Sequence, residues 1–220
     1  MPLHKLCSNE YNIGMERHTL ATKRSAGRPR AFDREQALGI ALDLFWRHGF
    51  AGTSTAQLST AMGIAPPSLY AAFGGKEALY REAVALYLTR YGGFMSAPLT
   101  ANCTARDAVE RVLLGAAKQF GQAEHAPGCM VSCAELHASP DNAALVADMA
   151  GLRQAAQRAI HARLEGARRS GELPTKTDTS TLAAFYAMVV QGMAVQARDG
   201  AKTTRLRHRA AWAMQAWPDA

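Results

Sequence analysis

TSTAQLSTAMGIAPPSLYAAFGGKEALY, residues 53–80, decides the fold, because it predicts two short helices joined by a tight turn and followed by a third helix. Ser54 begins the first helix, and its hydroxyl can form a capping box with the Gln57 side chain. Gly63 ends this helix, since glycine readily takes the left-handed conformation found at a helix C-terminus. The tandem prolines from Pro66 are tolerated only in a first turn, so the second helix begins there. The stretch therefore predicts a DNA-reading helix-turn-helix.

The outward face of the second helix has an unusual composition. It consists of Pro67, Ser68, Tyr70 and Ala71. This set is too small and too apolar for an ordinary solvated surface, but it suits a base-pair edge and a phosphate. Lys76 begins the third helix, where a cation opposes the helix dipole and a phosphate would remove the conflict. The alternative is a plain helical hairpin in an all-α enzyme or scaffold.

Residues 33–80 resemble the DNA-binding domain of the tetracycline-repressor (TetR) family of bacterial transcription regulators. The matched positions lie in register without a gap and are Gly49, Phe50, Thr53, Ser54, Leu58, Gly63, Leu69, Tyr70, Phe73, Lys76, Glu77 and Leu79. Two positions depart from the family pattern: Ala65 replaces a capping Ser or Thr, at a cost of about 1 kcal/mol, and Gly75 replaces a common Ser. The resemblance implies an all-α fold, with an N-terminal three-helix helix-turn-helix domain and a C-terminal helical ligand-binding and dimerisation domain.

The net charge of +7 is unevenly distributed along the chain. Residues 1–30 hold six basic residues against two acidic ones, a net charge of +4, whereas residues 31–91 are balanced. The segment 23–30, KRSAGRPR, contains Gly-Arg-Pro, which resembles the AT-hook core of arms that enter narrow minor grooves. We therefore expect residues 1–30 to form a disordered basic arm that binds DNA, the alternative being a solvated tail without that role.

The expected DNA contacts lie in this arm and in the helix-turn-helix. They are Arg28, Arg30, Thr53, Ser54, Gln57, Pro67, Ser68, Tyr70, Ala71 and Lys76. The reading helix offers no arginine or asparagine for bidentate base contacts. Methyl contacts to thymine, the Gln57 side chain and the arm are therefore expected to supply much of the specificity.

The composition of the 220-residue chain, 48% hydrophobic, favours a folded protein with a substantial core. No apolar run reaches the ~18 residues needed to cross a bilayer and no signal peptide begins the chain, so a cytoplasmic location is expected. The four cysteines are irregularly spaced and do not indicate a disulfide framework. The motifs GxSxG, HExxH, GxGxxG and the P-loop are missing, so we predict no enzyme, no catalytic residue and no cofactor. An all-α enzyme and a non-specific architectural DNA binder remain as alternatives.

The positions of helix stop signals predict three parts. These are the basic arm at 1–30, the helix-turn-helix domain at 31–80 and a helical effector-binding and dimerisation domain at 81–220. Beyond the helix-turn-helix, helices are expected at 76–91, 104–124, 129–138, 142–170, 179–198 and 203–215. A break at Gly92 and Gly93 and a loop at 98–103 separate the first of these from the rest.

The last long helices differ in polarity. The helix at 142–170 is amphipathic, with Arg153 on its polar side, and is expected to lie at a surface. The segment 182–197 is apolar almost all round, so one side can pack in its own domain and the other against a partner subunit. The residues expected at this interface are Leu182, Phe185, Val189 and Met193. A homodimer would let two reading helices bind a palindromic operator, and the alternative is a central buried helix in a monomer.

The resemblance also implies that the C-terminal helices enclose a pocket for a small-molecule effector, whose occupation releases the protein from its operator. The helix at 76–91 is the expected lever, because it belongs to the DNA-binding domain and reaches the pocket. The expected pocket residues are Tyr87, Phe94, Cys129, Met130, Cys133, His137, Tyr186 and Gln191. Among regulators of this kind, we expect this one to repress rather than activate its genes.

Cys129, Cys133 and His137 recur at every fourth residue of the helix expected at 129–138. Residues four apart share one face of a helix, too far apart for a relaxed disulfide but within reach of a common soft metal ion. A regulator that responds to metals, thiol reagents or oxidants through Cys129 and Cys133 is therefore an alternative. We predict no bound metal, since buried cysteines commonly act as small hydrophobic residues and zinc sites draw ligands from several segments.

Overall fold

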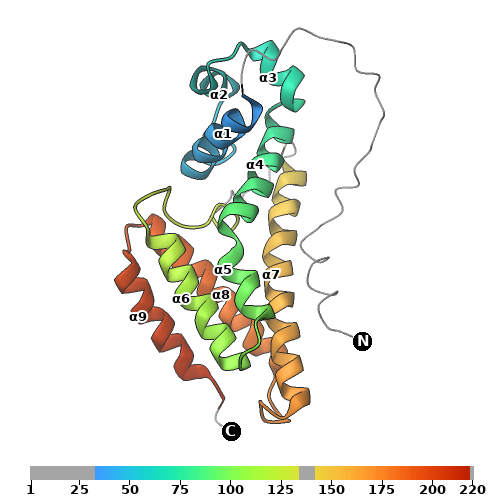
Figure 1. Cartoon of the computed structure of the whole chain (residues 1–220), viewed down its shortest axis with the longest axis vertical. Helices are drawn as coiled ribbons and strands as arrows, with labels where there is room; N and C mark the ends of the chain where they lie inside the picture. Colours follow the sequence, from blue (N-terminus) through green and yellow to red (C-terminus); the bar gives the residue numbers. More distant parts are fainter. Residues whose placement is uncertain (1–32, 134–141, 219–220) are drawn as a thin grey trace.

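The computed structural model describes residues 33–133 and 142–218, and all regular structure within these ranges is helical. The helices are α1 (Arg34–His48), α2 (Thr55–Met62), α3 (Pro66–Phe73), α4 (Lys76–Tyr91), α5 (Gly93–Thr100), α6 (Ala105–Gly121), α7 (Ala143–Ser170), α8 (Thr179–Arg198), α9 (Thr203–Ala213) and the 3-10 turn η2 (Met214–Ala216). Figure 1 shows α1, α2 and α3 gathered at one end of the molecule. From there α4 leads to a second bundle built from α5 to α9. The expected all-α fold is thereby confirmed.

The capping chemistry expected for α2 is present. The Ser54 hydroxyl oxygen accepts from the Gln57 amide at 3.1 Å, and the Gln57 side-chain oxygen accepts from the Ser54 amide at 2.7 Å. Gly63 ends the helix with φ 67° and ψ 31°, a conformation that costs little only for glycine. The next helix begins at Pro66, and Ala65 before it makes no side-chain capping bond. Local sequence chemistry alone therefore fixes the turn between α2 and α3.

Arg34 connects three helices of the first bundle. Its Nη2 donates to both carboxylate oxygens of Glu82 at 2.7 Å, and its Nε donates to the carbonyl of Ala72 at 3.3 Å. The guanidinium also lies 4.5 Å from the centroid of the Phe73 ring. One side chain on α1 therefore holds both the C-terminal turn of α3 and the middle of α4.

We expect Arg34→Ala to lower the free energy of unfolding by about 1–2 kcal/mol, because a forked ion pair, a hydrogen bond and a cation–π contact are lost together. Urea unfolding followed by circular dichroism measures this change. Arg47→Ala is the matched control, since among the described residues the Arg47 guanidinium pairs only with the exposed Asp43 one turn earlier on the same helix, and its loss should change stability by less than about 0.5 kcal/mol. Equal effects of the two variants would contradict the role given to Arg34.

An aromatic cluster connects the first bundle to the second. The Trp46 ring of α1 packs edge-on against Tyr87 of α4 at 4.8 Å and stacks on His125, in the loop after α6, at 4.5 Å. Tyr91 of α4 completes the cluster, with its centroid 4.9 Å from that of Trp46. A displacement of Tyr87, or of the loop that holds His125, would therefore press directly on Trp46 of α1.

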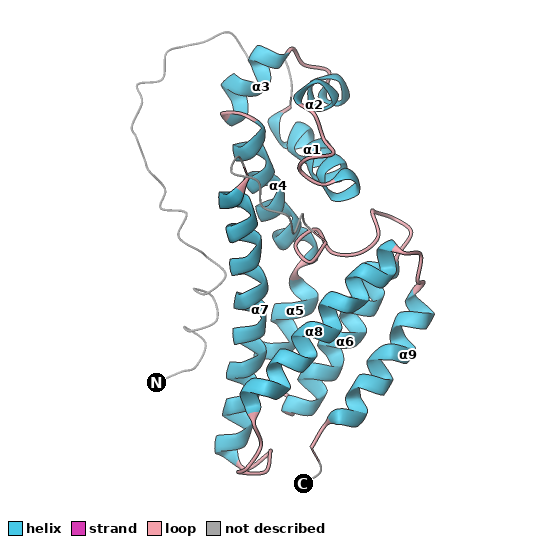
Figure 2. Cartoon of the chain, turned by 180° about the vertical axis from the view of Figure 1, so that it is seen from behind, coloured by secondary structure: helices cyan, strands magenta, loops and turns pink. Residues whose placement is uncertain are grey.

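The second bundle is built around α6, which packs against α5, α8 and α9. Figure 2 shows α7, the longest helix, running beside α4 and α5, while α8 crosses toward α6. Arg81 of α4 donates to Asp148 of α7 at 2.8 Å and so fixes the first turns of α7 to the DNA-binding end. The helix expected at 142–170 therefore runs along the second bundle and reaches up to α4.

Two expected boundaries were wrong. The helix α4 ends at the break expected at Gly92, but residues 93–100 form α5, so the loop expected at 98–103 begins only after Thr100. Met95 and Leu99 are buried against the core, and this burial outweighs the poor helix propensities of glycine and proline. The helix expected at 129–138 is present only as one turn within the described residues, in which the Cys133 amide donates to the Cys129 carbonyl at 2.8 Å. The rest of that segment, including His137, lies outside the described residues, as does the basic arm at 1–30.

Candidate DNA interface and effector cavity

The outward face expected for α3 is exposed. Pro67 and Ala71 are exposed, Tyr70 keeps 54% of its surface accessible, and Ser68 is half-buried. Leu69 and Phe73, on the opposite side of the helix, are buried. The helix therefore presents a shallow face of small side chains and one phenol ring to the outside.

The two polar side chains at the start of α2 are also exposed, but they are engaged with each other. The Gln57 side-chain oxygen is used on the Ser54 amide, which leaves the Gln57 side-chain nitrogen as a donor for an outside acceptor. Thr53 does not fit the role expected for it. Its side chain is buried and its hydroxyl donates to the Gly49 carbonyl at 2.8 Å, so it closes the turn after α1.

Lys76 occupies the first position of α4, where its ammonium lies 4.0 Å from the centroid of the Phe50 ring. The electron-rich ring face offsets part of the conflict between a cation and the helix dipole. Gly75, directly before it, has φ 125°, which side chains with a Cβ rarely adopt, and lies under the Tyr70 ring. The departure from the family pattern at Gly75 thus has a conformational reason.

The reading face carries no charged side chain, because residues 54–75 include no Lys, Arg, Asp or Glu. Lys76 is the first cation that follows them along the chain. Arg28 and Arg30, the other expected contacts, lie outside the described residues. Shape and apolar contact are therefore the means of recognition that α3 itself offers.

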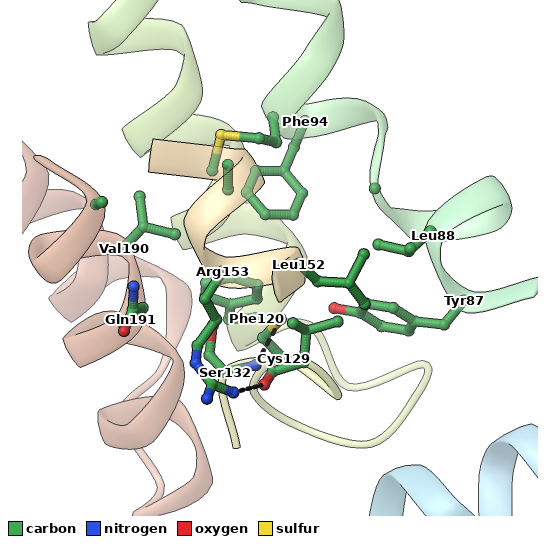
Figure 3. A pocket seen from close by; sticks show the side chains of 15 residues that line it. Tyr87, Leu88, Phe94, Phe120, Cys129, Ser132, Leu152, Arg153, Val190 and Gln191 are labelled. Carbon is green, nitrogen blue, oxygen red and sulfur yellow. Dashed lines mark hydrogen bonds between the residues drawn. The ribbon is translucent and has the colours of Figure 1, made fainter. Parts of the chain in front are cut away.

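A small cavity of about 70 Å³ lies in the second bundle, between α4, α5, α6, α7, α8 and the turn after Cys129. Its lining residues are Tyr87, Leu88, Gly92, Phe94, Met95, Phe120, Cys129, Val131, Ser132, Leu152, Arg153, Ala156, Ala187, Val190 and Gln191. Figure 3 shows these side chains converging from helices that are far apart in the sequence. Four of the expected pocket residues, Tyr87, Phe94, Cys129 and Gln191, are among them.

Of the other expected pocket residues, Met130, Cys133 and Tyr186 are not in this lining, and His137 lies outside the described residues. Met130 is buried in the same turn. The Cys133 sulfur instead lies against Gly128, 3.3 Å from the position that a Cβ on this glycine would occupy. Tyr186 points away into a separate part of the core, where its ring packs on Phe185 and Trp217 and burial raises its pKa to about 12. Met130 and Cys133 lie in the turn that follows α6, and Tyr186 lies on the side of α8 that packs on Trp217, so the sequence positions of these residues did not reveal which way their side chains point.

Arg153 is the main lining residue that the sequence pattern misplaced. It lies on the side of α7 that was expected to be solvated, yet it is half-buried and its Nη1 donates to the Val131 carbonyl at 3.0 Å. Phe120, Leu152 and Val190 were missed because an apolar periodicity identifies a core face without saying whether it borders a void.

Tyr87 combines two roles in the structure. Tyr87 is only 1% exposed, and its hydroxyl makes no hydrogen bond of regular geometry with a described residue, its polar neighbours being the Cys129 thiol and the Met130 backbone. Burial, followed by the neighbouring Cys129 thiol, raises the pKa of Tyr87 well above its usual value, so the phenol is neutral and able to donate. The opposite side of the ring is the contact to Trp46 described above.

The two cysteines of the loop have different surroundings. Cys129 is buried and its sulfur accepts from the Ser132 amide at 3.4 Å, whereas Cys133 is half-buried and burial raises the pKa of its thiol. Within residues 33–133 and 142–218, no group of three His, Cys, Asp or Glu side chains could hold a metal ion. His137, the third ligand of the metal alternative, lies outside those ranges.

One face of α8 is apolar and uncovered. Met188 is 62% exposed and Val195 49% exposed, and Trp212 of α9 is 71% exposed. Phe185 and Val189 are half-buried along the same stripe, and Leu182 lies at its start. Leu182, Phe185 and Val189 are three and four residues apart, as in helices that pack against each other.

Met193 does not belong to this stripe, which corrects the expected interface. It is 2% exposed and faces the core of its own bundle. Within the described residues α8 is also the one helix whose length and apolarity would allow it to cross a membrane, although the sequence holds no unbroken apolar run of that length. Its other face packs on α6 and α7, as that of a core helix does.

Comparison with known proteins gives consistent matches. Residues 38–83 match the family model described as "Bacterial regulatory proteins, tetR family". The chain is 32% identical over 204 residues to the HTH-type transcriptional repressor ComR of Escherichia coli K12, covering 91% of this chain and 96% of ComR. It is 38% identical over 117 residues to the repressor BdcR of the same organism, covering 51% of this chain and 57% of BdcR.

A solved structure extends the similarity to three dimensions. It contains a cysteine mutant of the TetR family transcriptional regulator CifR complexed with 26-bp double-strand operator DNA. The two folds superpose with a TM-score of 0.83 at 41% identity, over 87% of this chain and 100% of that chain.

Proposed function

Because this chain belongs to the TetR family of bacterial regulatory proteins, we propose that it is a homodimeric repressor that binds a palindromic operator and is released by a small-molecule effector. Its relatives are DNA-binding transcriptional regulators and not enzymes. The observation that carries the proposal is the exposed, uncharged face of α3, held on a fold that superposes on an operator-bound relative. The proposal includes a cytoplasmic location, because a bacterial gene regulator acts where the DNA is.

The dimer part of the proposal rests on the exposed stripe of α8 and on Trp212 of α9. Apolar side chains this exposed, in a continuous row, are typical of a protein interface. A two-fold axis along this stripe would give the assembly two reading helices. Two helices bury enough DNA surface for specific binding, which one short helix does not.

The effector part rests on the cavity and on its connection to the reading head. Tyr87 lines the cavity and contacts Trp46 of α1, so one residue borders both the proposed effector and the DNA-binding bundle. A ligand that prefers the DNA-incompetent conformation by about 1–3 kcal/mol would produce a useful change in operator affinity.

The test of this function is footprinting of the DNA upstream of the protein's own gene. We expect a protected segment with two-fold symmetric sequence, bound at least 1,000-fold more tightly than scrambled competitor at physiological salt. Equal affinity for the genomic segment and for scrambled DNA would contradict sequence-specific regulation and favour an architectural role.

The basic arm is proposed to add minor-groove contacts. Arg28→Ala should weaken operator binding several-fold and reduce the slope of log affinity against log salt by about one unit, since one phosphate contact is lost. Fluorescence anisotropy across a salt series measures this slope. Lys5→Ala removes the same charge from the far end of the arm and should change the slope less, and an unchanged slope for Arg28→Ala would rule out the arm's role.

A thiol-responsive regulator remains the second candidate function, because Cys129 is the one cysteine in the cavity lining of the described chain. The variant Cys129→Ser distinguishes a thiol-responsive regulator from one that binds its effector reversibly. If release depends on a thiol reaction, the variant keeps its operator affinity but no longer responds to a thiol reagent. If the effector binds reversibly, the response is retained.

A further inference from the structure

The cavity wall contains a buried polar group that lacks a partner. The Tyr87 hydroxyl makes no hydrogen bond of regular geometry with a described residue, although Tyr87 is only 1% exposed, and its polar neighbours are the Cys129 thiol and the Met130 backbone. Figure 3 shows this hydroxyl directed into the cavity. Leaving a buried hydroxyl unpaired is costly, so few such groups are found in native proteins without a reason. A ligand oxygen that accepts from Tyr87 would remove this cost.

A cation borders the same small space. Arg153 uses Nη1 on the Val131 carbonyl, and no carboxylate of the described residues forms an ion pair with its guanidinium. A guanidinium has five N–H donors in a planar fork that matches a carboxylate. A half-buried guanidinium therefore favours an anionic ligand over a neutral or cationic one.

The rest of the cavity is apolar and small. Phe94, Phe120 and Val190 line it from α5, α6 and α8. Its volume of about 70 Å³ is roughly half that of the ~150 Å³ engineered cavity that holds benzene. The occupant is therefore compact, with an aliphatic tail of only a few carbons.

We propose that the effector cavity takes a short-chain aliphatic carboxylate, with its oxygens accepting hydrogen bonds from Tyr87 and Arg153 and its alkyl group against Phe94, Phe120 and Val190. This assignment rests on the effector-controlled function proposed above and gives that site a ligand class. Tyr87 is then both a ligand contact and the link to the reading head, because its ring packs on Trp46.

Isothermal titration of the full-length protein with butyrate, butyramide and butylammonium tests the ligand class. The three probes share a four-carbon chain and differ in the charge of the head group. We expect butyrate to bind at least tenfold more tightly than butyramide, and butylammonium more weakly than both. Equal affinity for butyrate and butyramide, or no binding of butyrate at millimolar concentration, would overturn the assignment.

Two variants test the residues. Tyr87→Phe removes only the hydroxyl and should weaken butyrate about tenfold, while Arg153→Gln should weaken it at least tenfold and remove the preference over butyramide. Arg158→Gln is the matched control, since Arg158 is exposed one or two turns further along α7 and is not in the lining. Unchanged butyrate affinity in Arg153→Gln would overturn the assignment even if the wild type binds.

A fluorescence measurement tests the link to the reading head. In a Trp212→Phe, Trp217→Phe background, Trp46 is the remaining tryptophan, and butyrate should change its emission in a saturable way that Tyr87→Phe diminishes. Operator release is measured separately by gel shift. Butyrate that binds with the expected preferences but leaves the operator complex intact supports the ligand class and contradicts effector control. Failure of all butyrate binding contradicts the ligand class alone.

Discussion

Replacing Ala71 with glutamate is expected to lower operator affinity at least 100-fold. Ala71 lies on the exposed face of α3, where a new carboxylate would meet DNA phosphates and the acceptor groups of base edges. Like charges brought together in an interface cost several kcal/mol, and a dimer would carry the substitution twice. This is the largest effect among the variants considered, because nothing else on the reading face carries charge that could compensate.

The measurement is fluorescence anisotropy with the operator defined by footprinting. Gln154→Glu is the matched control, since it adds the same charge at an exposed position of α7, far from the reading face. The free energy of unfolding of Ala71→Glu should stay within about 0.5 kcal/mol of the wild type, because the position is exposed. Operator binding within threefold of the wild type would mean that α3 is not the reading helix.

Met188→Glu is expected to convert the dimer to monomers and, as a result, to remove high-affinity operator binding. Met188 is 62% exposed on the apolar stripe of α8, so in a two-fold dimer each subunit would bring one carboxylate into the interface. Burying unpaired carboxylates costs several kcal/mol, which raises the dimer dissociation constant by 100-fold or more. A monomer presents one reading helix and loses the gain from simultaneous binding of two half-sites.

Sedimentation velocity measures the fraction of dimer, and protein concentrations from about 1 to about 100 µM cover the expected change in the dimer dissociation constant. Met188→Leu is the control, because it keeps a hydrophobic side chain of similar volume and should remain dimeric. If Met188→Glu stays dimeric, the stripe on α8 does not form the interface. If the wild type itself is a stable monomer, the homodimer proposal fails as a whole.

The helix-turn-helix could be predicted from sequence because its determinants are local. Ser54, Gln57 and Gly63 act through hydrogen bonds and backbone angles within a few residues, and each behaves in the structure as expected. The bounds of α4 and α8 were also predictable from the stop signals that flank them. Thr53 was misassigned because a threonine at a turn can close it or face outward, and only the Gly49 contact decides between these.

The second bundle was less predictable because its features depend on how distant helices pack. Burial of Met95 and Leu99 makes α5 a helix despite its glycines and Pro98, and no local signal reports that burial. Met193 was assigned to the interface because an apolar surface all round α8 does not indicate which side faces the core. Arg153 was assigned to solvent because its cavity forms only when the turn after Cys129 packs on α7.

The uninterrupted course of α4 has a mechanical consequence. Tyr87 lies eleven residues beyond Lys76 on one helix, a distance of about 16 Å at 1.5 Å per residue. A rotation of about 10° around a pivot near Tyr87 would therefore displace the Lys76 end by roughly 3 Å. In a symmetric pair the displacements add, so the separation of the two heads could change by up to about 6 Å against the 34–36 Å between successive major grooves. A small rotation at the cavity end of a rigid α4 is therefore enough to move the two reading helices out of register with successive major grooves.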